Sequence, residues 1–156
     1  MQEEYLDILD ENGNKTNITK KRTEVHRDGD WHKAVHIWII NENGDILLQR
    51  RASNRDYPNM LDISCAGHLS AGDDSTTGAL RELKEELSLE IDPHELKYIT
   101  TLKRSPKDKD GFVDNEFDDL YLLRTNKKIE DLTYQREEIS EILFVPYKEF
   151  KKMVDN

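Results

Sequence analysis

Short apolar runs alternate with polar turns along most of the chain, a pattern typical of β-strands. The run HKAVHIWII (residues 32–40) ends at NENG and is followed by DILLQRR, which together predict a β-hairpin. Four more strands are predicted from similar runs, at residues 61–66, 97–103, 116–123 and 141–145. In the first of these, LDISCA, strict alternation predicts that Leu61, Ile63 and Cys65 point to the same face.

Two segments have the 3.6-residue repeat of amphipathic helices instead. The first covers residues 75–87 and can be capped at its N-terminus by Asp74 or Ser75. Its apolar stripe consists of four residues: Ala79, Leu80, Leu83 and Leu87. Pro146 begins the second helix, YKEFKKMVD. Strands that surround one helix and precede another predict an α/β fold with a mixed β-sheet between helices.

The first 30 residues have a weaker pattern. Apolar positions alternate loosely around the turn signal at Asn12 and Gly13, and the segment then becomes polar and basic. We expect a short hairpin followed by a linker, which together form an N-terminal extension (residues 1–30) before one domain (residues 31–156). A length of 156 residues is sufficient for one domain with its own core.

Composition argues against several classes of partner. With 23 Lys and Arg against 33 Asp and Glu, the formal net charge is −10, whereas proteins that bind phosphate backbones usually present a basic face. No apolar run approaches the roughly 18 residues that span a bilayer, and the acidic N-terminus lacks the features of a signal peptide. The single cysteine, Cys65, excludes an intrachain disulfide and fits a reducing compartment. We therefore expect a cytoplasmic protein that binds neither nucleic acid nor membranes.

The sequence RELKEE, within the first predicted helix, places three carboxylates on one stripe. Glu82, Glu85 and Glu86 are spaced i, i+3, i+4, so they are neighbours that repel one another by roughly a few tenths of a kcal/mol per pair. Arg81 is four residues before Glu85 and is placed to hold that carboxylate. By itself the stripe is consistent either with a solvated face or with the binding of a cation.

The spacing around RELKEE extends this pattern into a longer motif. Gly67 is followed after five residues by Asp73, after seven more by RELKEE, and then by Ser88 and Leu89. This arrangement resembles the Nudix box, which has a glycine, a glutamate, an REU-x-EE core and a glycine before an aliphatic residue at the same distances. Asp73 replaces the first glutamate with a shorter acid. Ser88 replaces the glycine that ends the helix in a left-handed turn, at a cost of roughly 1 kcal/mol.

The resemblance implies a fold, a metal and a reaction. Nudix proteins are α/β/α sandwiches in which the helix glutamates and a backbone carbonyl bind metal. Carried over to this chain, the ligands are Glu82, Glu86 and Glu85, with the carbonyl of Ala66 or Gly67. Clustered carboxylates suit Mg²⁺, with Mn²⁺ as an alternative, and such a cation would bridge a diphosphate and activate an attacking water. The implied reaction is hydrolysis of a nucleoside diphosphate linked to another group.

A further acid is expected downstream of the box. The segment VDNEFDD contains Asp114, Glu116 and Asp118, which strand alternation places on one face. Family members usually supply an additional acid from this region, and Glu116 is our candidate for an extra metal ligand or a general base. The residues assigned to catalysis are therefore Glu82, Glu85, Glu116 and Arg81.

The wider flanks resemble one branch of the family. The segment from HKAVHIWII to the Gly-His pair is similar to isopentenyl diphosphate isomerase and its hydrolase relatives, and the similarity extends to about Pro146. It implies that Arg51 and Arg55 grip the diphosphate, because guanidinium forks match phosphate oxygens. His68, which we assign to substrate binding, matches a metal-binding histidine of the isomerases, and His32 resembles another.

Isomerase-like activity is the less favoured alternative. The isomerases use a cysteine directly before Gly-His, where this chain has Ala66, and alternation places the neighbouring Cys65 in the core. The complete set of glutamates favours hydrolysis over isomerisation, and also over a binding module without turnover. His32 and His36 lack the intervening glutamate of a zinc-protease helix, so the pattern alone interprets them as ordinary strand residues.

The expected partner is thus a small molecule that contains a diphosphate. Its identity is expected to depend on the loops at residues 52–60 and 104–113. By analogy with the family, the first 30 residues are expected to contribute to a homodimer contact.

Overall fold

Nine strands and three helices are present in the computed structural model, which describes residues 4–55, 57–105 and 114–155. The strands are β1 (Tyr5–Leu9), β2 (Lys15–Lys21), β3 (His32–Ile40), β4 (Ile46–Arg51), β5 (Leu61–Asp62), β6 (Cys65–His68), β7 (Lys97–Arg104), β8 (Glu116–Arg124) and β9 (Ile139–Val145). The helices are α1 (Arg22–Asp28), α2 (Ser75–Leu87) and α3 (Tyr147–Asp155), with short 3-10 helices at Pro93–Glu95 and Ile129–Asp131. Both helices and most strands predicted from the sequence are confirmed within about two residues.

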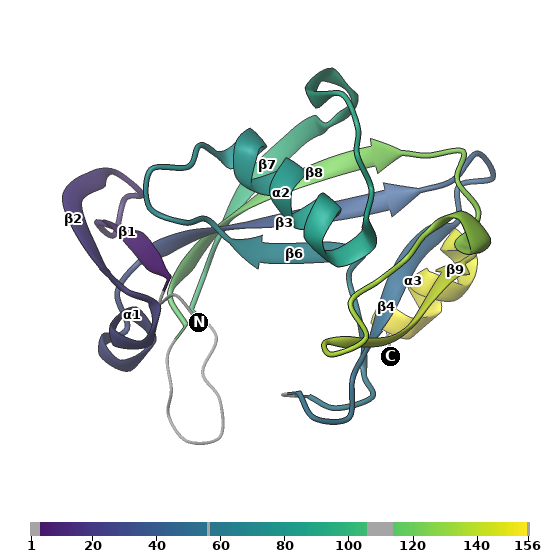
Figure 1. The fold of residues 1–156 in the computed structure, drawn as a ribbon, viewed down its shortest axis with the longest axis horizontal. Helices are drawn as coiled ribbons and strands as arrows, with labels where there is room; N and C mark the ends of the chain where they lie inside the picture. The colour runs from purple at the N-terminus through teal and green to yellow at the C-terminus, as the bar shows by residue number, and fades with distance from the viewer. Residues whose placement is uncertain (1–3, 56, 106–113, 156) are drawn as a thin grey trace.

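Seven of the strands form one mixed sheet (Figure 1). Its main order is β5-β4-β3-β8-β7, with β6 paired to β3 and β9 paired to β4. The central strands β3 and β8 are parallel over their full length, and the other pairs are antiparallel. Because these strands carry the cavity residues described below, the parallel pairing fixes which side chains of β3 and β8 stand next to each other.

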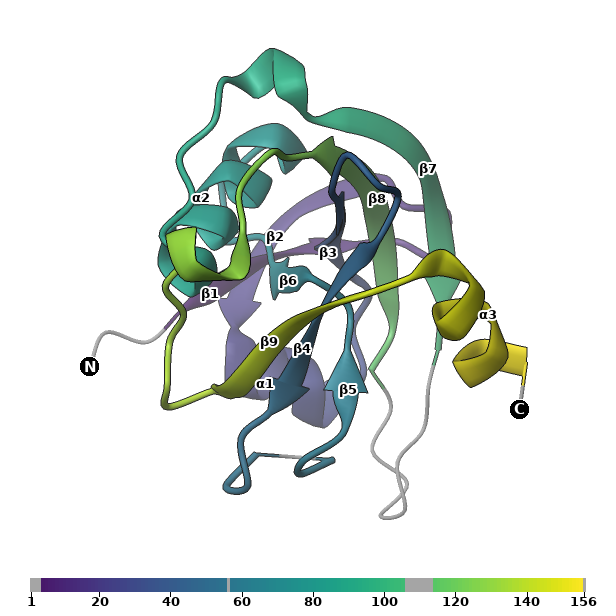
Figure 2. The same ribbon diagram turned by 90° about the vertical axis from the view of Figure 1, so that its right-hand side faces the viewer.

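Helices α2 and α3 cover opposite faces of this sheet (Figure 2). On the α2 face, Val35 and Ile37 of β3 pack with Leu83 in the main hydrophobic core. On the other face, the Phe150 ring of α3 meets Trp38 with ring centroids 5.6 Å apart. The predicted α/β/α sandwich is therefore confirmed. Among the described residues, no helix has the length and apolarity needed to cross a lipid bilayer.

The sheet forks beside β3, and this fork corrects one prediction. Strand β3 pairs with β4 only at Ile40 and then pairs with β6 instead. At the fork the buried Ser64 hydroxyl accepts the N–H of Ile39 at 2.9 Å and donates to the carbonyl of Leu47. The predicted single strand at residues 61–66 is thus two strands, β5 and β6.

The break at Ser64 also changes which side chains share a face. Cys65 packs in the core under α2, whereas Leu61 packs in the cluster beneath α3. The prediction that these two residues point to the same face is therefore wrong, because alternation holds only while a strand is continuous. The prediction that Cys65 is a core residue is confirmed, since its side chain is fully buried.

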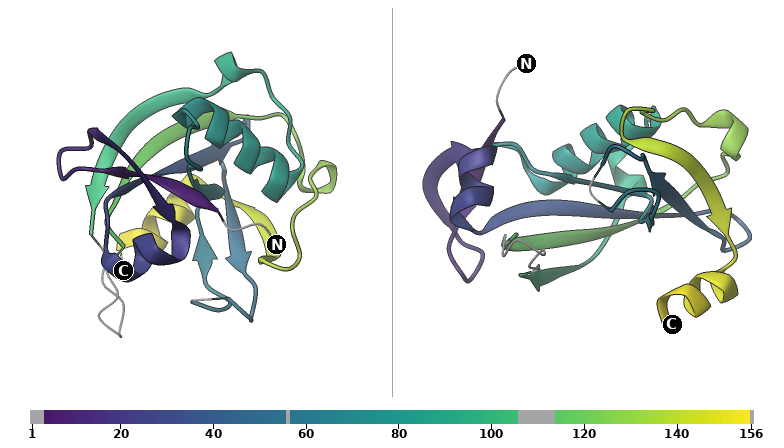
Figure 3. Two further views of the ribbon diagram at one scale, coloured as in Figure 1. Left: turned by 60° about the vertical axis from the view of Figure 1, so that its left-hand side comes forward. Right: turned by 90° about the horizontal axis from the view of Figure 1, so that it is seen from below.

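The N-terminal segment forms a hairpin and a helix at the end of the sheet away from α3 (Figure 3). Strands β1 and β2 form the predicted hairpin. The predicted linker is instead helix α1, which ends at Gly29 in the left-handed conformation (φ 71°). Only Val25 of α1 is buried, against Leu6 and Ile8 of β1, so the sequence has no apolar stripe that would reveal this helix.

Candidate active site

A cavity of about 860 Å³ opens between α2, β6, the loop from β4 to β5, and the N-terminal segment. Its size lies within the range of small-molecule sites, roughly 300–1,000 Å³. All of the predicted site residues except Arg81 line it: Arg51, Arg55, Ala66, His68, Glu82, Glu85, Glu86 and Glu116. The structure therefore brings together side chains that were predicted from separate parts of the sequence.

One wall of the cavity is helix α2, which begins and ends as the sequence predicts. The side chain of Asp74 caps the N-terminus by accepting the N–H of Thr77 at 2.8 Å. Ser88 ends the helix in the left-handed conformation (φ 53°), although it is not glycine. Its N–H and that of Leu89 bond back to the last carbonyls of the helix, which stabilises the turn. The replacement of glycine by serine therefore leaves the helix end in the expected geometry.

Gly67 of β6 lets this wall approach the sheet closely. A methyl group on Gly67 would lie 2.2 Å from Cδ of Glu82, much closer than atoms can pack. The first position of the motif is thus glycine because the Glu82 carboxyl lies directly against the β6 backbone. Next to it, the side chain of Glu86 is buried, with Oε2 lacking a hydrogen-bond partner in the described chain.

Burial changes the protonation of these two carboxyls. Burial, reinforced by the neighbouring Glu86 and Glu85, raises the pKa of Glu82 to about 8. Burial also raises the pKa of Glu86 to about 7, although hydrogen bonding from Cys65 and the backbone of Ala66 works in the opposite direction. Close carboxylates of this kind are stabilised by a divalent cation with oxygen ligands, so this wall fits the Mg²⁺ or Mn²⁺ that the sequence predicts.

Arg81 acts from behind this wall. Its guanidinium pairs closely with Asp73 and donates to the His68 carbonyl at 3.3 Å. The predicted contact with Glu85 exists, but at 3.9 Å it is the longest of the ion pairs that Arg81 makes in the described structure. Arg81 thus ties the acid at position 73 to the helix. The shorter side chain of Asp73 is long enough to make this contact.

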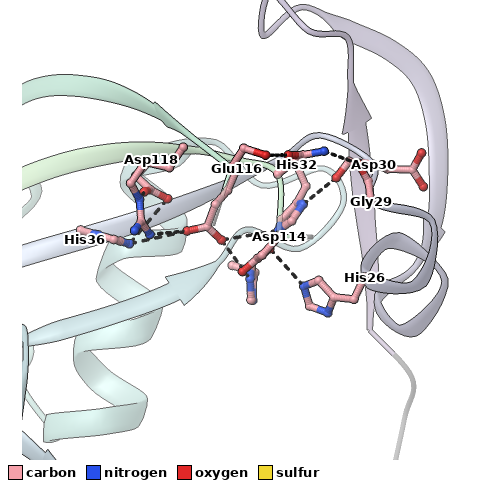
Figure 4. Close-up of polar contacts among 12 residues, drawn as sticks. His26, Gly29, Asp30, His32, His36, Asp114, Glu116 and Asp118 are labelled. Carbon is pink, nitrogen blue, oxygen red and sulfur yellow. Dashed lines mark hydrogen bonds and ion pairs between the residues drawn. The ribbon is translucent and has the colours of Figure 1, made fainter. Parts of the chain in front are cut away.

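The opposite wall is a cluster of histidines and acids (Figure 4). His26 of α1, His32 of β3, His68 of β6 and Asp114 before β8 have ligand atoms within 4.8 Å of one another. Asp114 Oδ1 lies 3.2 Å from Nε2 of His32 and 3.7 Å from Nε2 of His26. The Nδ1 atom of His32 bonds the carbonyl of Asp30 at 3.0 Å, which turns Nε2 toward the cluster. Imidazole and carboxylate together suit transition-metal cations.

A second group, beside the first, already contains its own cation. Glu116 and Asp118 of β8 lie on the same face, as strand alternation predicts, and His36 approaches both. Arg104 of β7 bonds both acids, with Nη2 2.8 Å from Oε1 of Glu116. Its guanidinium therefore neutralises part of the charge of this group.

The protonation of the second wall follows from these contacts. Burial opposes a charge on His32, but hydrogen bonds to Asp114 and Glu116 raise its pKa to about 9. Burial and the neighbouring His68 lower the pKa of His26 to about 4. Burial also opposes a charge on Glu116, yet hydrogen bonds from His32 and His68 lower its pKa well below the usual range. Glu116 is therefore held as a carboxylate and is a weak proton acceptor.

Several cavity residues were not assigned a site role from the sequence. His26 and Arg104 lie in segments with no motif around them, and His36 was interpreted as an ordinary strand residue. No local spacing links them, because they meet only when α1, β3 and β7 are placed around β8. Glu4 and Arg22 also line the cavity. Together with His26, they are the described residues that the N-terminal segment contributes to its lining. Most of the predicted specificity loop at 104–113 lies outside the described residues.

The two arginines assigned to the diphosphate line the cavity, Arg51 from the end of β4 and Arg55 from the loop between β4 and β5. Arg51 pairs with Asp62 at 3.3 Å, and Arg55 pairs with Glu138 at 3.4 Å. Both pairs are at least partly exposed, so each contributes little to stability and can be exchanged for a phosphate contact at small cost. The structure thus keeps both guanidiniums at the cavity.

Comparison with known proteins agrees with this geometry. The model of the NUDIX domain matches residues 30–156. The chain belongs to the NUDIX family. It is 43% identical to Nudix hydrolase 3 of Arabidopsis thaliana over 99% of its own length, but spans only 21% of that protein. It is 36% identical to an uncharacterised Nudix hydrolase of Clostridium acetobutylicum, of which it covers 76%. The predicted enzyme class, a Nudix hydrolase, is therefore confirmed.

The predicted branch of the family is also confirmed. The chain is 30% identical to an isopentenyl-diphosphate Delta-isomerase of Shigella boydii, over 92% of this chain and 81% of that protein. A crystal structure from Deinococcus radiodurans superposes with a TM-score of 0.77 and 21% identity, covering 97% of this chain and 89% of the other. The NUDIX domain of Shewanella oneidensis NrtR in complex with ADP ribose has a TM-score of 0.59 and 15% identity, over 77% and 75% of the two chains.

Proposed function

We propose that this NUDIX protein is a Mg²⁺-dependent pyrophosphohydrolase that cleaves a small molecule of the nucleoside diphosphate type. The observation that carries the proposal is the pair of neighbouring carboxyls, the partly buried Glu82 and the buried Glu86, lining a cavity that is also lined by Arg51 and Arg55. Such a cavity has acids for a cation on one side and guanidiniums for phosphate oxygens on the other.

The roles of the α2 wall follow from its geometry. Glu82, Glu86 and Glu85, with the carbonyl of Ala66 on β6, would hold the divalent cation. A bound cation would neutralise phosphate charge and lower the pKa of a water molecule. Arg81 keeps the motif loop in place through Asp73 rather than touching the substrate.

The role of Glu116 is that of a ligand or anchor in this proposal. Its carboxylate is already engaged by Arg104, His32 and His68, so it is less suited to accept a proton than Glu82 is. The cluster of His26, His32, His68 and Asp114 offers a second cation site, because its ligand atoms lie within 4.8 Å of one another. A cation bound there would have to displace the proton that the raised pKa of His32 retains at neutral pH.

The experiment is a screen for diphosphate hydrolysis with Mg²⁺ and with Mn²⁺, in which added alkaline phosphatase releases inorganic phosphate from the phosphomonoester products for detection. Substrates should include nucleoside diphosphates and triphosphates, nucleotide sugars and dinucleoside polyphosphates. Glu86→Gln should lower turnover at least about 1,000-fold while leaving the circular dichroism spectrum unchanged, because the amide has the same shape but cannot neutralise the cation. Glu90→Gln, an exposed glutamate just beyond α2, is the matched control and should keep full activity. Full activity of Glu86→Gln would remove the assignment.

Isomerase-like activity is the second candidate, favoured by the histidine cluster and by the resemblance to isomerases. Two observations weigh against it. Ala66 has no group that could transfer a proton, and the thiol of Cys65 is buried in the core with its pKa raised by burial. Incubation with isopentenyl diphosphate and either cation should yield no dimethylallyl product. Formation of that product would favour the second candidate.

A further inference from the structure

The loop between β4 and β5 presents an aromatic ring to the cavity. Tyr57 and Met60 both line the cavity, yet the two residues are 62% and 56% exposed. Large apolar side chains usually pack, and these two remain open on the side of the molecule where Arg51 and Arg55 also lie. The end of β4 and the loop after it therefore carry both the guanidiniums proposed to bind phosphate and an unfilled apolar surface.

The backbone of Tyr57 is strained. Its φ is +52°, a region that bulky residues rarely adopt, and it precedes Pro58, which restricts the preceding residue toward extended backbone. Asn59 also has a positive φ of +62°. Strain of this kind persists only where surrounding contacts enforce it, and it is concentrated at ligand-binding and catalytic sites.

Hydrogen bonds at the base of the loop enforce this conformation. Arg51 and Met60 are joined by the bond from the Arg51 N–H to the Met60 carbonyl at 2.9 Å, and the Asn59 N–H bonds the Arg51 carbonyl at 3.0 Å. The Met60 N–H closes the turn on the Tyr57 carbonyl at 3.3 Å. Since the Tyr57 ring itself is mostly exposed, packing of the ring does not account for the strain. The backbone hydrogen bonds of the loop, and not packing of the ring, therefore keep Tyr57 at the cavity.

We infer that Tyr57, with Met60 beside it, is the platform on which the base of a nucleoside diphosphate substrate stacks. This inference rests on the proposed function and names the part of the substrate that does not react. An exposed ring offers one flat face, which suits a planar base, whereas an alkyl chain gains affinity only when apolar walls enclose it on several sides. Among the described residues the remaining cavity lining is mostly charged and offers no such enclosure.

Binding and turnover of ADP-ribose should be measured for the wild type, Tyr57→Ala and Tyr57→Phe. Stacking on an aromatic ring accounts for roughly 5- to 100-fold in affinity, so Tyr57→Ala should raise Kd and KM by about tenfold with little change in kcat. Tyr57→Phe should behave like the wild type. Tyr147→Ala, which removes a similarly exposed tyrosine of α3 outside the cavity, is the control and should have no effect.

Two further measurements separate this inference from the proposed function and from a structural role. Isopentenyl diphosphate has no base, so its Kd should be the same for the wild type and for Tyr57→Ala. Tyr57→Gly should bind ADP-ribose as weakly as Tyr57→Ala but melt no lower than the wild type, since glycine relieves the positive φ. Unchanged ADP-ribose affinity in Tyr57→Ala, no binding by the wild type, or an equal loss for both ligands would overturn the inference. Binding without hydrolysis of any substrate to phosphomonoester products would instead contradict the proposed function.

Discussion

The two walls of the cavity compensate their charge in different ways. On α2, the partly buried Glu82 lies near the buried Glu86, Arg81 supplies the nearby positive charge, and the pKa values of both carboxyls are raised. On the opposite wall, Glu116 is surrounded by histidines and Arg104, and its pKa is lowered. In the proposed function the first wall therefore takes up a cation from solution, whereas much of the second wall is neutralised within the chain. We therefore expect an added cation to change the net charge of the α2 wall more than that of the opposite wall.

The substitution Gly67→Ala is expected to disturb the α2 wall most without changing any charge. The added methyl group would displace Glu82, and a shift of about 1 Å in a catalytic group costs roughly 100-fold in rate. We expect kcat/KM to fall at least about 100-fold, as measured with the best substrate from the screen. Gly44→Ala is the control, because the same methyl group would meet open space at Gly44, which has the positive φ that Gly67 lacks. It should lose about 1 kcal/mol of stability and no activity. Equal activity of the two variants would contradict the proposed close approach.

Asp114→Asn tests the opposite wall, called the histidine wall below, which is formed by His26, His32, His68 and Asp114. This change removes the carboxylate that His26 and His32 share, while keeping the shape of the side chain. We expect the affinity for Co²⁺ or Zn²⁺ at this wall to fall roughly 10- to 100-fold, the range typical of a lost ligand or supporting group. The visible spectrum of the Co²⁺ complex reports on it. Asp155→Asn, on α3, is the control. An unchanged Co²⁺ spectrum and affinity would mean that the cluster binds no cation.

The pH dependence of Mg²⁺ binding distinguishes the two walls further. The raised pKa values of Glu82 (about 8) and Glu86 (about 7) mean that cation binding must release protons at neutral pH. Protonation of these carboxyls competes with the cation, so the apparent Kd for Mg²⁺ should increase about tenfold or more as pH falls from 8 to 6. Calorimetry in two buffers with different heats of ionisation would count the released protons. Binding that is independent of pH over this range would place the cation elsewhere.

The smallest effect on activity is expected from Ser64→Ala at the fork of the sheet. This variant leaves the Ile39 N–H and the Leu47 carbonyl without their shared partner in a buried place. The free energy of unfolding should fall by about 1–3 kcal/mol, as measured by urea titration, with kcat/KM almost unchanged. Ser140→Ala, at an exposed position of β9, should change stability by less than about 0.5 kcal/mol. A large loss of activity in Ser64→Ala would show that the fork also positions the catalytic groups.

The sequence predicted the α2 wall because its information is local. The spacing of Glu82, Glu85 and Glu86 within one helix determines their shared face, and the distance to Gly67 is fixed by one loop. The histidine wall could not be predicted in this way. His26, His36 and Arg104 come from α1, β3 and β7, and the last two elements meet only through the pairing of each with β8, which no spacing encodes.

The fold shows the same contrast. Strands and helices with strong periodicity were predicted within about two residues. Helix α1 was missed because a single buried residue, Val25, anchors it. The strand at residues 61–66 was predicted as continuous because the role of Ser64 depends on two strands distant in sequence.

The most direct test of the difference between the two walls is a count of bound Mn²⁺ by electron paramagnetic resonance. The wild type, Glu86→Gln and Asp114→Asn should be titrated at pH 8 together with turnover measurements. We expect Glu86→Gln to lose one Mn²⁺ together with activity, and Asp114→Asn to keep the Mn²⁺ bound by α2. If Glu86→Gln keeps the Mn²⁺ stoichiometry and the turnover of the wild type, the α2 wall is not the catalytic cation site.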